Sequence, residues 1–129
     1  DALLDRAVGV ARELSTASGD GPLIHADLHY ENVLATLAGT DPQRGSWVAI
    51  DPKPMAGDPE FAVLPMLWNR LDELDGSDQE AALLRRLEAL VDAAGLDMER
   101  ARAWSLVRVV ETVVWNAETG LVQQEHRPG

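Results

Sequence analysis

Two short apolar segments separated by a turn constrain the fold of this chain most strongly. Residues 33–36 and 47–50 carry mainly apolar side chains, and residues 39–42 between them read Gly-Thr-Asp-Pro. Such a segment favours a reversal of the chain, so we expect an antiparallel hairpin. Asn32 precedes the first strand and Asp51 follows the second, so strand pairing would bring their backbones within about 5 Å.

Polar groups gather around this expected hairpin. Residues 23–34 read LIHADLHYENVL, and residues 48–52 read VAIDP. The spacing His25-x-Asp27-x-x-x-x-Asn32, followed by an aspartate after the next apolar run, is typical of a phosphoryl-transfer loop. The first aspartate would orient a hydroxyl, and the asparagine and second aspartate would supply oxygen ligands to Mg²⁺, which takes few protein ligands.

These segments resemble the aminoglycoside phosphotransferase family, most closely its streptomycin 6-kinase and hydroxyurea-kinase branch. The catalytic segment of that branch typically reads His-Gly-Asp-Leu-His-x-x-Asn-Val-Leu, and Ala26 stands here in place of the usual Gly. The resemblance covers residues 5–69 through specific motifs and the remainder only as a helical pattern. It implies Asp27 as catalytic base, with Asn32 and Asp51 as ligands of Mg²⁺ that bind the ATP cofactor.

The resemblance also implies supporting residues and shows one departure. His25 is implied to brace the loop, and residues 57–59 look like the stretch after the family's metal-binding aspartate. The family commonly places another Asp beneath the catalytic loop, where this chain has Ala62. Glu60 is nearby but off register, so how the loop is braced stays open. Lys53, the only lysine, either steadies a phosphate or is a solvated charge.

The same loop permits a metallohydrolase interpretation. His25, Asp27 and His29 alternate along an extended segment and would point the same way, and imidazole with carboxylate suits zinc. That interpretation leaves Asn32 and Asp51 without a role, so we prefer phosphoryl transfer and count His29 as a supporting residue. A catalytically silent binding module is a further alternative, and the joint presence of the three polar loop residues argues against it.

The implied function is transfer of the γ-phosphoryl group of ATP to a hydroxyl of an aminoglycoside-type, streptomycin-like antibiotic, which would confer resistance. A kinase for another small alcohol, such as an amino alcohol or a sugar, is the alternative within this class. The motifs do not separate these acceptors, because the motif residues contact phosphates rather than the acceptor.

The length fits only part of such an enzyme. The chain has 129 residues and 46% hydrophobic content, which predicts one globular domain, whereas a two-lobed kinase would be roughly twice as long or more. No Gly-rich phosphate loop precedes His25. We therefore expect residues 1–129 to be a catalytic, substrate-binding carboxyl-terminal lobe without its amino-terminal nucleotide lobe, and to be inactive alone. The expected fold is α+β and mostly helical, a protein-kinase-like lobe with a small antiparallel hairpin carrying the active site.

Charge and cysteine content narrow the partners. The formal net charge is −11 and there is no cysteine, which excludes disulfides, thiolate catalysis and Cys-ligated zinc. Negative charge opposes binding to nucleic acid or an anionic membrane and would attract a small cationic substrate, although a merely soluble acidic surface has the same charge. The first residues show no secretory signal, so we expect a cytoplasmic location.

Apolar periodicity predicts four helices, with approximate bounds of 3–14, 60–74, 77–94 and 97–120. Pro65 is expected to kink the second helix or to mark a later start. Ser77 and Glu80 form a capping box for the third helix, which Gly95 ends. Asp97 is expected to cap the last helix.

The last helix carries the candidates for substrate contact. Glu111 lies among valines and is either at the helix edge in water or in a pocket paired to a cation. Trp68, Trp104 and Trp115 are expected in the core, with pocket lining as the alternative, and we take Glu111 and Trp115 as candidate substrate-binding residues. Three arginines are expected at the surface or in ion pairs: Arg85, Arg86 and Arg108.

Overall fold

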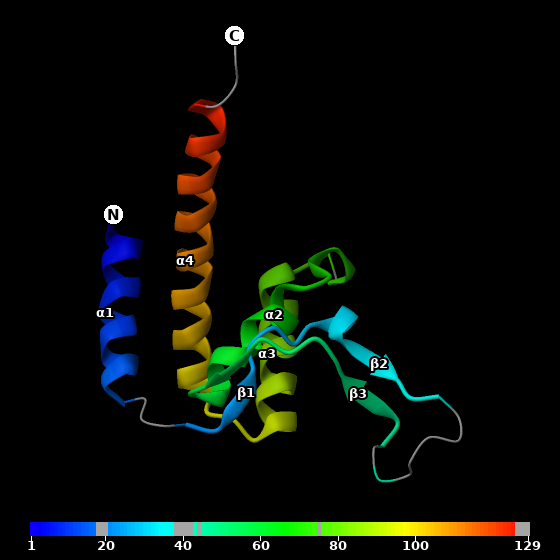
Figure 1. The fold of residues 1–129 in the computed structure, drawn as a ribbon. Coiled ribbons are helices and arrows are strands. Elements are labelled where there is room, and N and C mark those ends of the chain that lie inside the picture. Colours follow the sequence, from blue (N-terminus) through cyan, green and yellow to red (C-terminus); the bar gives the residue numbers. More distant parts are fainter. Residues whose placement is uncertain (18–20, 38–42, 44, 75, 126–129) are drawn as a thin grey trace.

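A computed structural model describes residues 1–17, 21–37, 43, 45–74 and 76–125. This part is mostly helical and contains two small antiparallel sheets (Figure 1). The helices and strands in chain order are α1 (Ala2–Ala17), β1 (Leu23–His25), β2 (Val33–Ala35), β3 (Trp47–Ala49), β4 (Pro54–Ala56), α2 (Val63–Trp68), α3 (Gln79–Ala94) and α4 (Met98–Glu125). The described residues also form 3₁₀ turns at Tyr30–Asn32, Pro59–Ala62 and Leu71–Glu73.

The predicted hairpin is confirmed. β2 pairs antiparallel with β3, with Val33 opposite Ala49 and Ala35 opposite Trp47. The expected turn at residues 39–42 lies outside the described residues.

A second strand pair was not predicted, so the expectation of a single hairpin was incomplete. β1 pairs antiparallel with β4, and His25 lies opposite Pro54. Pro54 can lie in this pair although proline cannot donate to a sheet, because both strands of a two-stranded sheet are edges, where proline is tolerated. Gly21 permits the close approach beside this pair, because a Cβ there would collide with the carbonyl of Gly57.

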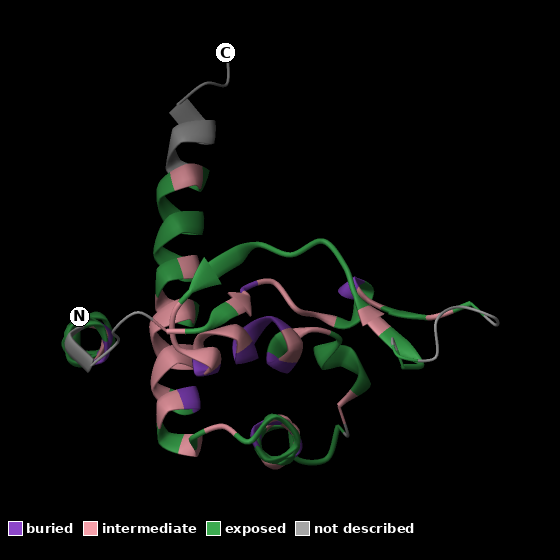
Figure 2. Cartoon of the chain, turned by 60° about the horizontal axis from the view of Figure 1, so that its bottom comes forward, coloured by how far each residue is buried: buried purple, intermediate pink, exposed green. Residues whose placement is uncertain are grey.

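The hydrophobic core surrounds α2. Short helix α2 lies between α3 and the first turns of α4, and Figure 2 shows buried residues gathered on α2. The core residues are Val63, Leu64 and Leu67 of α2, Leu87 and Val91 of α3, and Ala101 of α4. Ala101 is fully buried (0% exposed), which indicates that its small side chain allows α4 to pack closely here.

The prediction of one helix over residues 60–74 was wrong. Pro65 lies in the first turn of α2, where its missing N–H is tolerated, so it marks a later start. Beyond α2, Asn69 is extended (ψ 143°) and Arg70 is left-handed (φ 53°). The helical sequence pattern continues through this break, so the break depends on a tertiary contact.

Arg86 makes that contact. Its guanidinium donates to the carbonyl oxygens of Leu67 (3.1 Å), Asn69 (2.6 Å) and Arg70 (3.4 Å). These carbonyls lose their helical partners where α2 ends, and a planar guanidinium offers several donors to replace them. Arg86 is therefore half-buried and structural, not the surface or ion-pair residue that was expected.

Helix caps were predicted to within one residue. The cap of α3 is Asp78 rather than Ser77, and its Oδ1 accepts from the backbone nitrogen of Ala81 at 3.0 Å. Gly95 ends α3 in a left-handed conformation (φ 64°), as predicted. Asp97 caps α4 as predicted, accepting from the nitrogen of Arg100 at 2.8 Å. Helix α4 then continues to residue 125, beyond the expected end.

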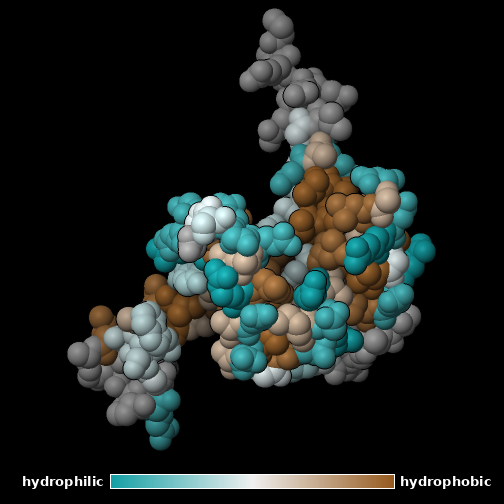
Figure 3. All heavy atoms as spheres, turned by 180° about the vertical axis from the view of Figure 1, so that it is seen from behind, coloured by the Kyte–Doolittle hydropathy of each residue, from teal (hydrophilic) through white to brown (hydrophobic). Residues whose placement is uncertain are grey.

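Helices α1 and α4 lie side by side and run in opposite directions (Figure 1). Ala7 and Leu14 are buried on α1, whereas Leu4 and Val8 remain 41% and 40% exposed. Viewed from behind, apolar side chains gather over these two helices (Figure 3). Among the described helices, none combines the length and apolar content needed to cross a membrane.

Candidate functional site

The loop between β1 and β2 carries most of the predicted site residues. His25 ends β1, Asp27 follows in a turn, and Asn32 closes the 3₁₀ turn before β2. The backbone nitrogen of Ile50 donates to the carbonyl of Asn32 at 2.9 Å. Asp51 directly follows Ile50, so the end of β3 brings it beside Asn32 in the backbone.

His25 fixes the loop to the end of β3. Its Nε2 lies 2.8 Å from the carbonyl oxygen of Ile50, and because a carbonyl only accepts, Nε2 must carry the proton and donate. The other nitrogen, Nδ1, is then an acceptor and takes the backbone N–H of Asp27 at 3.2 Å. The backbone nitrogen of Ala26 also donates to the carbonyl of Lys53 at 3.1 Å. The imidazole of His25 thus joins the loop to the strand that precedes Asp51.

Asn32 is buried and its amide orientation is determined by its partners. Its Nδ2 lies 2.9 Å from the carbonyl oxygen of Asp27, which can only accept, so the amide nitrogen must face it. The same Nδ2 lies 3.2 Å from Nε2 of His29, which then accepts. No described residue donates to Oδ1 of Asn32. That oxygen remains available as a ligand.

Asp27 forms an ion pair at this site. Its Oδ2 lies 3.0 Å from Nζ of Lys53, and the Asp27 side chain is 27% exposed against 75% for Lys53. The hydrogen bond from Lys53 holds the pKa of the Asp27 carboxyl below its usual range, although partial burial opposes this. The carboxylate is therefore ionised at neutral pH and can accept a hydrogen bond.

Asp51 has an unusual backbone conformation. It is exposed, with φ of 52°, and among the described residues only Asp51 and Arg70 combine positive φ with a side chain other than glycine. Regular alternation would place residue 51 on the face opposite Asn32, and a left-handed residue interrupts that alternation. Left-handed conformations of residues other than glycine are uncommon, and they cluster at active sites and ligand-binding sites.

The geometry does not support the zinc alternative. Both ring nitrogens of His25 are bonded to the backbone, and Nε2 of His29 is bonded to Asn32. Over the ranges that the structure describes, no group of three or more His, Cys, Asp and Glu side chains is arranged to hold a metal. The remaining nitrogen of His29, Nδ1, is buried without a hydrogen-bond partner in those ranges, 3.8 Å from Oε2 of Glu31.

Arg108 was expected at the surface or in an ion pair, but it is partly buried and bonds to the loop. From α4 it donates to the carbonyl of Phe61 (2.8 Å) and to the carbonyl of Ala26 (3.3 Å), and its guanidinium lies 4.3 Å from the centre of the Phe61 ring. Burial lowers the pKa of Arg108, and the nearby Glu111 opposes this. Its partners lie 47 and 82 positions earlier in the chain, so nothing local in the sequence identified it.

The acidic residues after Gly57 bond to α4 and to its start. Glu60 is buried, and its Oε1 accepts from the backbone nitrogen of Asp97 at 3.1 Å. Oδ2 of Asp58 accepts from Nε1 of Trp104 at 2.8 Å and pairs with Arg100. Glu60 therefore bonds to the start of α4. It does not brace the catalytic loop in place of the aspartate that the family commonly has where this chain has Ala62.

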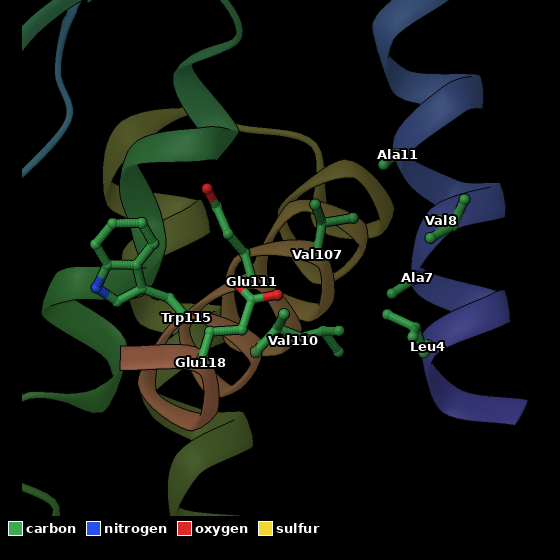
Figure 4. A pocket seen from close by; sticks show the side chains of 10 residues that line it. Leu4, Ala7, Val8, Ala11, Val107, Val110, Glu111, Trp115 and Glu118 are labelled. Carbon is green, nitrogen blue, oxygen red and sulfur yellow. The ribbon is translucent and has the colours of Figure 1, made fainter. Parts of the chain in front are cut away.

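Glu111 and Trp115 lie apart from the loop, in a pocket of about 330 Å³ between α1 and α4 (Figure 4). The pocket is lined by Leu4, Ala7, Val8 and Ala11 of α1 and by Val107, Val110, Glu111, Val114, Trp115 and Glu118 of α4. Trp115 is 65% exposed, so the expectation of core packing was wrong for it. Trp68 is also exposed, and Trp104 is half-buried with its ring edge-to-face with Phe61.

The pocket combines apolar and acidic groups. Glu111, Trp115 and Glu118 follow one another at helical spacing and project from the same side of α4. In Figure 4 the aliphatic side chains of Val107 and Val110 lie closer to α1 than the ring of Trp115 does. An aliphatic wall beside two carboxylates and an indole suits an organic cation with an apolar face.

Comparison with known proteins identifies the family. The family described as aminoglycoside/hydroxyurea antibiotic resistance kinase matches residues 1–120, and this chain belongs to that family. A hydroxyurea phosphotransferase from Kitasatospora aureofaciens is 43% identical over 97% of the chain. Streptomycin 6-kinases from Streptomyces griseus and Streptomyces glaucescens are 39% and 38% identical over 84% and 92% of the chain.

The chain spans about a third of the length of these relatives: 32%, 34% and 36% respectively. No solved structure gives a significant match.

Proposed function

We propose that this chain is the carboxyl-terminal catalytic lobe of an ATP-dependent phosphotransferase that phosphorylates a hydroxyl of an aminoglycoside-type, streptomycin-like antibiotic. The observation that carries the proposal is the loop itself. Asp27 is held ionised by Lys53, and the loop is fixed by Asn32, whose Oδ1 is unused by the described residues. Family membership supports the same class of reaction.

Asp27 acts as the catalytic base. Its carboxylate accepts the hydrogen bond, and then the proton, of the acceptor hydroxyl as that oxygen forms its bond to the γ-phosphorus and the bond to the leaving ADP breaks. A positioned base contributes about 10²- to 10⁴-fold in rate. His25 and Asn32 keep the loop in place during this step, because each bonds to a backbone group of Asp27.

Asn32 and Asp51 are the residues that would hold Mg²⁺. Both offer oxygen, which Mg²⁺ prefers, and a set of one carboxylate and one amide leaves positions for phosphate oxygens and water. The bonds made by Nδ2 of Asn32 leave its oxygen as the free atom of the amide. When bound, the ion would neutralise charge on the transferred phosphoryl group.

The pocket between α1 and α4 is the proposed acceptor site. Glu111 and Glu118 provide negative charge beside Trp115, which favours the guanidinium or ammonium groups of a cationic antibiotic. Hydroxyurea is a second candidate, favoured by the 43% identity to a hydroxyurea phosphotransferase. It is small and neutral and would make no use of the two carboxylates. An amino alcohol or a sugar remains the alternative acceptor class.

The lobe that binds the nucleotide is proposed to lie in a part of the full-length protein beyond these 129 residues. This follows from the share of the relatives that the chain covers and from the single lysine, Lys53, which already pairs with Asp27. We further propose a cytoplasmic location, because the proposed reaction consumes ATP.

The test is an acceptor panel with the full-length protein. ATP and Mg²⁺ would be incubated with streptomycin, hydroxyurea, ethanolamine and glucose, and each product analysed by mass spectrometry, with Mg²⁺ omitted as a control. We expect phosphorylation of streptomycin that requires Mg²⁺. Transfer to hydroxyurea alone would select the second candidate, and transfer to none of the four would contradict the proposal.

A further inference from the structure

We infer that Arg108 is a positioning residue for the catalytic loop, acting through the peptide bond that precedes Asp27. The inference rests on the proposed role of Asp27 as base. Arg108 lies on α4, far from Asp27 in sequence, and it is partly buried with its guanidinium against the ring of Phe61.

The peptide group between Ala26 and Asp27 is held from both sides. Its carbonyl oxygen, on Ala26, accepts from Arg108 at 3.3 Å, and its N–H, on Asp27, donates to Nδ1 of His25 at 3.2 Å. Because a peptide group is planar, fixing both its oxygen and its N–H fixes the orientation of the whole unit. The direction in which the Asp27 side chain leaves the backbone is then restricted.

The two side chains that hold this peptide group are fixed to different elements. His25 donates to the carbonyl of Ile50 at the end of β3, whereas Arg108 lies on α4 and donates to the carbonyl of Phe61. The nearby acidic residues Asp58 and Glu60 bond to α4, as described above. Arg108 therefore supplies a hydrogen bond by which α4 holds the loop.

A guanidinium suits this position better than an ammonium group would. One nitrogen of Arg108 reaches Phe61 and the other reaches Ala26, so the rigid fork keeps two segments at a fixed separation. Lysine provides one compact donor site and cannot match both directions equally well. The position also lies one helical turn before Glu111, so the same turn of α4 contacts the loop and begins the proposed acceptor pocket.

The experiment compares Arg108→Met and Arg108→Lys in the full-length enzyme with Arg86→Met as matched control. Arg86 is likewise partly buried and donates to backbone carbonyls, but at the end of α2. We expect Arg108→Met to lower kcat about 10- to 100-fold, the loss expected for misplacing a catalytic group by about 1 Å. The KM for ATP should change less than about twofold, Arg108→Lys should recover part of kcat, and Arg86→Met should leave kcat unchanged.

Hydrogen exchange provides a readout that does not depend on activity. Backbone amides in residues 23–32 should exchange faster in Arg108→Met than in wild type, and Arg86→Met should not show this change. If wild type transfers no phosphoryl group, the proposed function fails, and exchange in this segment still tests the contact.

Two results would overturn the inference. One is a folded Arg108→Met enzyme whose kcat and loop exchange match those of Arg86→Met. The other concerns Arg108→Lys, which replaces Arg108→Met as the test if Arg108→Met does not fold. Wild-type kcat together with wild-type hydrogen exchange of the loop in Arg108→Lys would exclude a positioning role for the guanidinium.

Discussion

Replacing Asn32 with alanine should affect both stability and catalysis, by amounts that the structure allows us to estimate. The change removes two hydrogen bonds of a buried side chain, one to the carbonyl of Asp27 and one to His29. At about 1 kcal/mol each, the free energy of unfolding should fall by about 2 kcal/mol. In domains of roughly 150 to 250 residues, a loss of about 2 kcal/mol lowers Tm by roughly 4 to 8 °C.

The loss in activity should be larger than the loss in stability suggests. Asn32→Ala removes both the bond that holds Asp27 and the proposed Mg²⁺ ligand, so kcat should fall by about 100-fold or more. Asn32→Asp separates these two effects. It retains a ligand oxygen but loses both donors, so it should keep its dependence on Mg²⁺ while being no more stable than Asn32→Ala.

The assay is thermal unfolding of the full-length enzyme followed by steady-state kinetics across a range of Mg²⁺ concentrations. Asn69→Ala is the matched control, because Asn69 is a partly buried asparagine whose Oδ1 has no hydrogen-bond partner among the described residues. It should change neither kcat nor Mg²⁺ dependence. An Asn32→Ala enzyme with the Tm and kcat of the Asn69→Ala control would show that Asn32 neither stabilises the loop nor contributes to catalysis.

Three further predictions concern the ion pair, the pocket and the chain itself. Lys53→Met should raise the pKa of Asp27 toward its usual range, measured by carbon NMR titration of that carboxyl, and an unchanged titration would show that Lys53 does not act on it. The stability that the lowered pKa of Asp27 contributes to the fold is present at neutral pH and is lost as the pH falls through that pKa. This contribution is small because Lys53 is exposed. Glu111→Gln should weaken binding of a cationic acceptor about two- to fivefold in calorimetry without affecting a neutral one, since an exposed ion pair contributes up to about 1 kcal/mol. The isolated 129-residue chain should show no ATP-dependent transfer in the acceptor assay, and turnover by it would mean that the nucleotide is bound here.

Local patterns in the sequence predicted those elements whose signals lie within a few residues. The hairpin followed from two apolar runs around a turn, and the end of α3 and the start of α4 followed from Gly95 and Asp97. The mixed, mostly helical fold was predicted for the same reason. The backbone proximity of Asn32 and Asp51 was a consequence of strand pairing alone.

The features that were missed depend on contacts between distant residues. Arg86 holds the break after α2, and Arg108 holds the loop. The sequence around each arginine looks like that around a surface arginine. The β1–β4 pair likewise depends on bringing residues 54–56 against a segment about 30 positions earlier. The exposure of Trp115 was missed because a tryptophan among valines has the same pattern in a core as in a pocket wall.

The role of Asp27 as catalytic base is tested most directly by single-turnover phosphoryl transfer with the full-length Asp27→Asn enzyme. Asparagine preserves the size of the side chain but cannot accept the proton of the acceptor hydroxyl. We expect product formation from ATP and the acceptor to be lost, while Tm and the Kd for ATP, measured by calorimetry, remain close to wild type. Undiminished transfer by Asp27→Asn would show that this loop does not provide the catalytic base.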